Sequence, residues 1–394
     1  MPEVRPGPWL RLIALGAAGA AALAVVSGAL SLHTAHRALA ALAVPPLAAL
    51  VAAAWVAHRR LLGPSAAALA SFLAAALVVG RPLHIAFAAL ALAAALMATA
   101  ATLHGEPVAA APWRDYVTLT KPRIMTLLLL TGACGLVVGA GGFPSAWLFI
   151  VTMAGLALAC GGASALNHVI DRDIDRHMRR TDRRPVAADR VAPTRALEFG
   201  LALSALSFVL LASLVNVLTA VLALAGNLFY VFVYTRWLKR STPQNIVIGG
   251  AAGAVPPLVG WAAATGNVTV PALLLFAIVF FWTPPHFWAL ALLIRRDYEA
   301  AGVPMLPVVR GERETTKQIV LYTVVLVAVT ASPFLYGTLG LPYLVAALVL
   351  GAVFFVLALG LRREPTPRRA ALLFHFSLLY LALLFAAMAL DTAL

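Results

Sequence analysis

Long apolar runs alternate with short polar connections along the chain of 394 residues. A helix needs about 20 apolar residues to cross a bilayer, and thirteen runs are about that long. None of them shows the alternating pattern of a membrane barrel strand, so the chain is predicted to be an all-α integral membrane protein. The thirteen expected spans lie near 9–30, 37–57, 65–81, 84–103, 122–142, 145–168, 195–215, 217–237, 244–263, 270–294, 318–338, 342–361 and 370–390.

The polar connections are of two kinds that alternate along the chain. Every second connection is rich in Lys and Arg, whereas those between them carry at most a lone flanking Arg. The positive-inside rule then predicts that the N-terminus and the basic connections are cytoplasmic and the C-terminus is outside. We expect the first run to be a retained helix and not a cleaved signal peptide. The basic connections lie at 58–62, 113–123, 171–195, 236–243, 295–317 and 362–369.

The composition supports the membrane assignment and explains the net charge. Hydrophobic residues make up 62% of the chain and charged residues 11%, whereas soluble domains are about a quarter charged. Because the basic residues gather in short loops, the net charge of +14 indicates a lipid bilayer and no nucleic acid as partner. The two cysteines, Cys134 and Cys160, lie inside apolar runs and are expected to be small buried hydrophobic residues.

The most polar joint between spans covers residues 104–121 and contains two prolines. We interpret it as the boundary between two parts of the chain. Residues 1–108 are predicted to form a four-helix transmembrane module, and residues 109–394 a nine-helix body.

Charged residues are densest in the stretch 167–185, NHVIDRDIDRHMRRTDRRP. Asn167, Asp171 and Asp175 follow one another at intervals of four, which places them on one face of a helix, while Asp173 points to the other side. Amide and carboxylate oxygens suit Mg²⁺, and the arginines that follow suit a diphosphate. The stretch predicts a Mg²⁺–diphosphate site at the cytoplasmic end of its helix. The alternative is a solvated loop whose arginines only fix the topology.

A second charged cluster, at 295–317, carries Asp297 and Tyr298. A carboxylate there that faces the first stretch across the bundle would complete a clamp around the metal and the diphosphate. The alternative is again a topological loop.

Two spans contain residues that are unusual against lipid. The segments 245–261 and 282–288 hold Gly and Pro pairs, whose freed backbone groups need cover from neighbouring helices, so both are expected to line an interior. His286 is an ionisable group inside a span and therefore a candidate functional residue, or else a hydrogen-bonded interior histidine. The nearby Trp282, Phe287 and Trp288 could face a carbocation or a flat macrocycle.

Five strings of the body together resemble the UbiA superfamily of intramembrane prenyltransferases. The fourth and fifth strings, with WTPPHFW and DYEAAGVPMLP, resemble its haem-directed branch, the protohaem IX farnesyltransferases. The wider superfamily usually has a second aspartate in its second acidic motif, where this chain has Ala301. The resemblance implies a nine-helix UbiA-type bundle. The strings are LTKPRIM at 119–125, NHVIDRDIDRHMRRTDRRP at 167–185, YTRWLKRSTPQNIVIGGAAGAVPPLVGW at 234–261, WTPPHFWALAL at 282–292 and DYEAAGVPMLPVV at 297–309.

This resemblance also implies an activity and a set of site residues. The activity is Mg²⁺-dependent transfer of farnesyl from farnesyl diphosphate to a vinyl group of haem b, which gives haem O for terminal oxidases. It further implies the inner membrane of a prokaryotic cell, with the site facing the cytoplasm. The implied residues are Asn167, Asp171, Asp175 and Asp297 for Mg²⁺ and catalysis, Lys121, Arg123, Arg180, Arg184, Lys239 and Arg240 for the diphosphate, and His286, Trp282 and Trp288 for haem.

The N-terminal module holds two histidines at matching places, because His36 opens the second span and His84 the fourth. On facing helices they could ligate one haem iron axially, with His33 as a neighbouring alternative. The segments 33–42 and 84–103 resemble one half of haem A synthase. This implies a haem-binding role, with haem A synthase or terminal oxidase assembly factors as partners. The alternative is a structural or partner-docking extension.

Two other functions stay open from the sequence. A quinone or other aromatic prenyltransferase of the same superfamily would share the acidic stretch, although the string WTPPHFW argues against it. A cation-coupled membrane transporter would also hold carboxylates in a span. Transporters usually place such charges near the bilayer midplane, whereas here they gather at one end beside arginines.

Overall fold

The structure is a computed structural model that describes residues 8–29, 43–44, 46–51, 65–66, 68–72, 91, 95 and 111–393. Its described part is helical and contains no strand. Nine of the described helices are long and apolar enough to cross a membrane, and they coincide with the nine spans predicted for the body. The body is therefore an all-α, multi-pass membrane bundle, as the sequence predicted.

The long helices begin and end within a few residues of the predicted spans, except that α16 starts earlier. Three short helices lie between them, and a fourth, α5, precedes α6. The long elements are α6 (Pro122–Ala140), α7 (Ala146–Ile170), α9 (Pro193–Leu214), the continuous span of α10 (Val217–Leu228), η2 (Phe229–Leu238) and α11 (Lys239–Ser241), α12 (Asn245–Thr265), α13 (Val270–Leu293), α16 (Gly311–Leu335), α17 (Leu341–Arg363) and α18 (Pro367–Ala393). The short ones are α5 (Trp113–Leu119), α8 (Arg172–Arg176), α14 (Arg295–Ala300) and α15 (Leu306–Val309).

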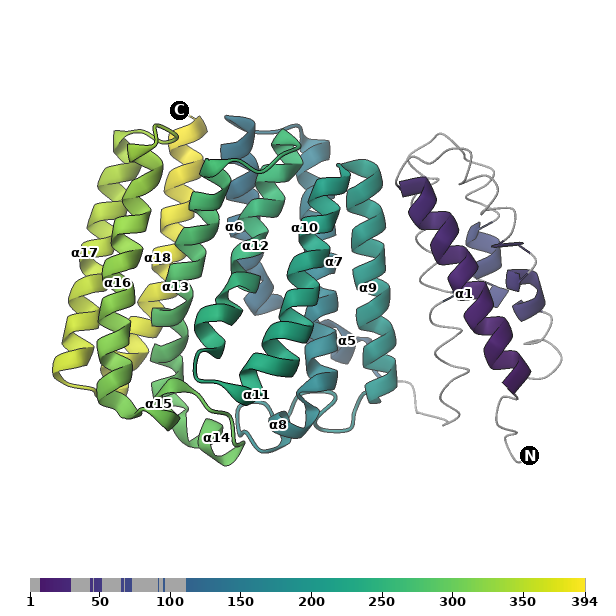
Figure 1. The fold of residues 1–394 in the computed structure, drawn as a ribbon, viewed down its shortest axis with the longest axis horizontal. Coiled ribbons are helices and arrows are strands. Elements are labelled where there is room, and N and C mark those ends of the chain that lie inside the picture. The colour runs from purple at the N-terminus through teal and green to yellow at the C-terminus, as the bar shows by residue number, and fades with distance from the viewer. Residues whose placement is uncertain are drawn as a thin grey trace.

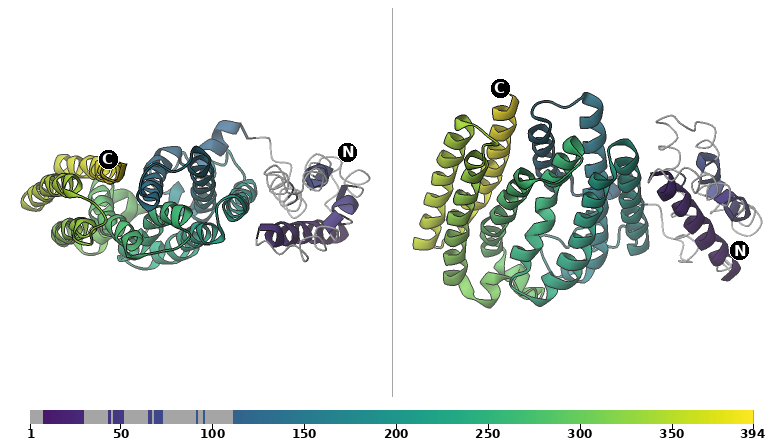
Figure 2. Two further views of the ribbon diagram at one scale, coloured as in Figure 1. Left: turned by 90° about the horizontal axis from the view of Figure 1, so that it is seen from above. Right: turned by 45° about the horizontal axis from the view of Figure 1, so that its top comes forward.

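Three of these short helices, together with α11, gather at one end of the bundle. Figure 1 shows α8, α11, α14 and α15 at its lower end, while the C-terminus lies at the upper end. Seen end-on in Figure 2, the long helices run side by side as one bundle. The basic connections of the body thus lie at a common end, which is the arrangement that their alternation along the chain predicts.

Helix α12 lies at the centre and has the largest buried share of the nine spans. Small residues let its backbone approach α6 closely. A side chain on Gly135 would overlap the backbone of Pro257, and one on Gly260 would overlap the carbonyl of Gly132. The Gly- and Pro-rich segment predicted to line an interior is therefore the packing axis of the bundle.

Helix α1 (Pro8–Ala29) matches the first predicted span and contacts α9. The proposed haem ligands His36 and His84, and the alternative His33, lie outside the described residues. The four-helix module and its boundary at residues 108 and 109 therefore stay predictions.

Candidate active site

A cavity of about 520 Å³ lies inside the body. Its walls come from helices along the whole body, which are α6, α7, α10, η2, α12, α13 and α18. The charged side chains of its wall come from the end of the bundle where the short helices lie. The deeper wall is apolar and aromatic, and it carries Trp282, His286, Phe287, Phe374, Leu378 and Leu381.

Asn167, Asp171 and Asp175 lie on one helical face although the helix is interrupted at Asp171. Helix α7 ends at Ile170, and α8 begins at Arg172 after a slightly displaced Asp171. Backbone hydrogen bonds continue across this step, from the Asp171 amide to the Asn167 carbonyl at 2.9 Å and from the Asp175 amide to the Asp171 carbonyl at 2.8 Å. The structure therefore brings all three predicted side chains together on the cavity wall.

Asn167 links three neighbours through its side-chain amide. Its Nδ2 donates to Asp171 Oδ2 at 2.8 Å and to Thr235 Oγ1 at 3.1 Å. Its Oδ1 accepts from Lys121 Nζ at 2.6 Å. Because both ends of the amide are hydrogen-bonded, Asn167 fixes the positions of a carboxylate and an ammonium group in the cavity.

Lys121 reaches the cavity from a strained backbone position. It precedes Pro122, the first residue of α6, and has φ 51° and ψ 60°, in the left-handed region. A non-glycine residue there costs roughly 1–3 kcal/mol, and such strain concentrates at functional sites. Loss of hydration on burial, followed by the charge of Arg184, holds the pKa of Lys121 well below its usual range, although Asp171 and Asp175 act in the opposite direction.

Both buried carboxylates are paired with cations. Asp171 Oδ2 accepts from Lys239 Nζ at 2.6 Å, and both oxygens of Asp175 accept from Arg184 Nη1 at 2.8 Å. Asp171 Oδ1 is buried and makes no hydrogen bond to any described residue. The guanidinium of Arg240 lies close to this oxygen, with Nη2 at 3.9 Å. A buried carboxylate oxygen without a hydrogen bond is unfavourable unless a ligand satisfies it, and a metal ion would do so.

The donor set fits Mg²⁺ that is shared with a phosphorylated ligand. Among the described residues, no group of three or more His, Cys, Asp or Glu side chains is placed to hold a metal. A metal ion at this place would therefore have two carboxylate ligands from the described residues, Asp171 and Asp175. Magnesium is commonly held by one or two carboxylates together with substrate phosphates and water.

Positive charge exceeds negative charge on this part of the wall. The two carboxylates face five cationic side chains. This surplus suits a diphosphate, which brings several negative charges. The five cations are Lys121, Arg184 and Lys239 deeper in the wall and Arg123 and Arg180, which are exposed.

A π-helical segment, η2, aligns three of the lining residues. Tyr230, Tyr234 and Lys239 all line the cavity. At about 100° per residue in an α-helix, Lys239 would face away from Tyr230, nine residues earlier. A π-helix has about 4.4 residues per turn, so nine residues make close to two full turns. The wider helix therefore carries Lys239 round to Asp171.

At the apolar end, His286 lies in an aromatic stack. The imidazole is 4.3 Å from the Trp282 ring and 4.8 Å from the Phe374 ring, with interplanar angles of 15° and 21°. Its Nδ1 lies 2.6 Å from Ser377 Oγ on α18. Gly253 of α12 also lines the cavity, and a Cβ there would face open space. The sequence prediction of a functional or hydrogen-bonded histidine thus corresponds to a buried, hydrogen-bonded side chain on the cavity wall.

Three predicted site residues do not line the cavity. Asp297 is half-buried on α14, whereas its neighbour Tyr298 is on the wall. Trp288 is fully buried against Tyr322, with ring centroids 5.3 Å apart. Trp282 and His286 share a face of α13 because they are four residues apart, and Trp288 lies two residues beyond that face. The assignments of Asp297 and Trp288 stay predictions.

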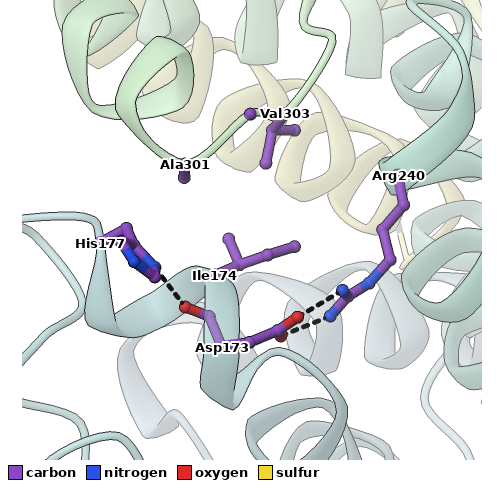
Figure 3. A pocket seen from close by; sticks show the side chains of 7 residues that line it. Asp173, Ile174, His177, Arg240, Ala301 and Val303 are labelled. Carbon is purple, nitrogen blue, oxygen red and sulfur yellow. Dashed lines mark hydrogen bonds and ion pairs between the residues drawn. The ribbon is translucent and has the colours of Figure 1, made fainter.

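The third residue off the cavity wall, Arg240, pairs with the aspartate that was predicted to point away. Figure 3 shows its guanidinium against Asp173, at 2.6 and 2.7 Å, beside a pocket of about 250 Å³. Arg240 also donates to the Ile170 carbonyl at 2.7 Å. The hydrogen bonds from Arg240 to the Asp173 carboxylate lower the pKa of Asp173 to about 2. Arg240 therefore ties η2 and α11 to the end of α7, and its contact with a diphosphate stays a prediction.

Several lining residues carried no clear signal in the sequence. Tyr230, Tyr234 and Tyr298 are aromatic residues near polar ones, a weak hint, and their alignment depends on the π-helix or on α14. Ser377 does not line the cavity but contacts His286, and it is an ordinary serine in an apolar span. Its role depends on α18 packing against α13, which local sequence does not reveal.

Together, the helices form a membrane bundle that encloses a cavity with one cationic end and one apolar, aromatic end. The chain belongs to the UbiA prenyltransferase family, whose model matches residues 128–386. It is accordingly a prenyltransferase.

Similar curated proteins are described as protoheme IX farnesyltransferases. One from Symbiobacterium thermophilum is 57% identical over 280 residues, which cover 71% of this chain and 94% of that relative. One from Thermus thermophilus is 53% identical over 283 residues, which cover 72% of this chain and 46% of that relative. One from a Roseiflexus species is 53% identical over 278 residues, which cover 71% of this chain and 52% of that relative. The chain matches about half the length of these last two relatives.

Solved structures of low sequence identity share the fold. A digeranylgeranylglyceryl phosphate synthase structure gives a TM-score of 0.61 at 18% identity, covering 71% of this chain and 98% of the other. An apo UbiA homologue from Aeropyrum pernix gives a TM-score of 0.53 at 19% identity, covering 68% of this chain and 98% of the other. A UbiA homologue from Archaeoglobus fulgidus bound to GPP and Mg²⁺ gives a TM-score of 0.50 at 18% identity, covering 70% of this chain and 99% of the other.

Proposed function

We propose that the protein transfers a farnesyl group from farnesyl diphosphate to a vinyl group of haem b and so makes haem O. The observation that carries this proposal is the 57% identity to a protoheme IX farnesyltransferase of nearly the same length as the matched segment. The two-ended cavity supports it, since one end is cationic and the other is apolar and aromatic. The Mg²⁺ and prenyl diphosphate in the Archaeoglobus homologue support the same ligand class here.

In the proposed reaction, the bond between farnesyl C1 and the diphosphate oxygen breaks, and diphosphate leaves with the electron pair. Farnesyl C1 then bonds to the terminal carbon of the vinyl group, which leaves a cation on the carbon next to the porphyrin. Water adds to that cation and loses a proton, which gives the hydroxyl of haem O. The apolar wall excludes other water from the allylic cation.

The cationic residues of the wall stabilise the leaving group. Lys121, Arg184 and Lys239 lie inside, where charge interactions are strong, and Arg123 and Arg180 lie nearer the surface. Asn167 holds Lys121 and Asp171 in place. Asp171 and Asp175 would hold Mg²⁺, which as a Lewis acid would neutralise charge on the diphosphate.

The apolar end would receive the prenyl chain and the haem. Tyr230 and Tyr234 add aromatic rings to the same cavity wall as the charged residues and the stack of Trp282 and His286. Such faces stabilise nearby positive charge. His286 is the proposed haem contact, with Trp282 beside it.

The decisive experiment is incubation of the purified protein with haem b, farnesyl diphosphate and Mg²⁺. Chromatography and mass spectrometry should show haem O and an equal amount of diphosphate. Omission of Mg²⁺ or haem b should remove the product. Prenylation of an aromatic quinone precursor in place of haem b would support a quinone prenyltransferase and reject this proposal.

We further propose the setting of this reaction. The charged end of the body faces the cytoplasm of a prokaryotic cell, because the basic connections gather there. Residues 1–108 form a separate transmembrane module that binds haem through His36 and His84. Its partners would be haem A synthase or terminal oxidase assembly factors, which use farnesylated haem.

A further inference from the structure

Ser377 on α18 contacts two aromatic residues of α13. The Trp282 Nε1 donates to the Ser377 carbonyl oxygen at 2.8 Å, and His286 Nδ1 lies 2.6 Å from Ser377 Oγ. Trp282 and His286 are four residues apart and stacked on each other. Ser377 is completely buried. One serine therefore fixes both rings at the apolar end of the cavity.

A third contact sets the direction of the bond to His286. Ser377 Oγ lies 2.6 Å from the carbonyl oxygen of Phe374. Two oxygens at that distance need a proton between them, because their lone pairs otherwise repel each other. A hydroxyl has one proton, so Ser377 donates to Phe374 and accepts from His286 Nδ1. The neutral imidazole thus carries its proton on Nδ1 and its lone pair on Nε2.

The Nε2 atom is held in place without a partner of its own. It makes no hydrogen bond to any residue in the described part of the chain, and it is not sealed from the cavity that His286 lines. Stacking between Trp282 and Phe374 keeps the ring from turning over. The lone pair of Nε2 is therefore fixed and available to a ligand.

We propose that Ser377 is a positioning residue that holds His286 as an axial ligand of the haem iron. This inference rests on the proposed function, which makes haem b the substrate. Histidines that ligate metals almost always donate their other ring N–H to an oxygen acceptor, which fixes the tautomer and raises ligand basicity. Ser377 is that acceptor here.

The depth of His286 in the bundle agrees with this role. It lies seven residues before the end of α13 at Leu293, which is roughly 10 Å at 1.5 Å per residue. The charged wall lies at that same end of the bundle. Haem ligated at His286 would thus lie beside the prenyl chain while its edge reaches toward the diphosphate end.

The test is a titration of haem b into the purified full-length protein, without farnesyl diphosphate, followed by absorption spectroscopy. His286→Ala defines the spectral component that depends on this ligand. Ser377→Ala should weaken that component's affinity about 10- to 100-fold and shift its spectrum toward that of His286→Ala. Ser377→Thr keeps the hydroxyl and should keep the wild-type spectrum. Ser332→Ala is a matched control, because Ser332 makes the same bond to the carbonyl three residues earlier, on α16 and outside the cavity wall.

Three results would overturn the inference. They are a wild-type spectrum in His286→Ala, wild-type affinity and spectrum in Ser377→Ala, or equal losses in Ser377→Thr and Ser377→Ala. Haem O synthesis by the wild-type protein tests the proposed function separately. If the wild type makes no haem O but shows the expected spectral series, the proposed function fails and the role of Ser377 stands.

Discussion

Asp171 and Lys239 form an ion pair in the wall of the cavity, with Nζ 2.6 Å from Oδ2, although 68 residues separate them in the sequence. Their side chains are 1% and 12% exposed. Removal of one partner of a buried pair leaves the other charge unpaired and costs about 3–5 kcal/mol. The pair thus joins the end of α7 to the end of η2, and substitutions at either residue need a folding control beside the activity measurement.

Replacement of either buried aspartate should abolish turnover. Asp171→Ala and Asp175→Ala remove proposed metal ligands, and Asp171→Asn and Asp175→Asn do so with little change in shape. We expect haem O formation to fall at least roughly 100-fold in each, in line with the loss of a preorganised electrostatic contact. Product formation at limiting Mg²⁺ measures the effect. Near-wild-type rates in the asparagine variants would reject the metal assignment.

Asp173→Asn is the matched control for these variants. Asp173 lies two residues from both aspartates and pairs with Arg240 outside the cavity wall. Its side chain is 63% exposed, and exposed ion pairs contribute little to stability. We expect turnover within a few-fold of wild type. If turnover fell as far as in Asp171→Asn, a position on the cavity wall would not explain the importance of Asp171.

Deletion of one residue from η2 should inactivate the enzyme. A shortened segment can relax toward an α-helix, which turns Lys239 away from the line of Tyr230 and Tyr234. Removal of Phe232, whose side chain is 60% exposed, alters the register and leaves the lining residues present. Phe232→Ala is the control, because it removes the same side chain and keeps the register. Equal activity in both variants would contradict a role for the π-helix.

The acidic site was predictable because its geometry is local. Asn167, Asp171 and Asp175 follow the helical period, and the step at Asp171 preserves it. The Gly and Pro pairs similarly identified interior segments, since lipid cannot satisfy freed backbone groups. The nine spans of the body followed from apolar length alone.

The remaining site residues depend on features that the helical period does not contain. Tyr230 and Lys239 share a face only in a π-helix. Proximity in sequence groups Trp288 with Trp282. However, Trp288 follows His286 by two residues, so its side chain points to another face of α13 and packs against Tyr322 in the core. Ser377 reaches His286 across 91 residues through the packing of α18 on α13. Such contacts arise from tertiary structure.

Labelling of engineered cysteines would test the proposed orientation. Sites near Gly142 and Asn267 lie at the end of the bundle opposite the basic connections, so a membrane-impermeant reagent added outside should reach them. Sites near Arg183 and Arg368 should react only after the membrane is opened. External labelling at Arg183 would reverse the orientation and move the site out of the cytoplasm.

Haem binding by the N-terminal module can be measured in the full chain. In a His286→Ala background, a remaining low-spin haem spectrum is expected from axial ligation by His36 and His84. Adding His36→Ala or His84→Ala should remove or convert that spectrum, because one axial ligand is lost. If the His286→Ala protein takes up no haem, the module is a structural or partner-docking extension.

The two buried ion pairs also bear on how a reaction cycle ends. Within the cavity wall Asp171 pairs with Lys239 and Asp175 pairs with Arg184. A ligand that draws these cations to itself must separate them from their carboxylates, so part of its binding energy is lost. After the allylic bond breaks, free diphosphate no longer gains from the buried prenyl chain, whereas re-formation of the pairs still favours its departure. Re-formation of the two pairs would therefore oppose product inhibition by diphosphate.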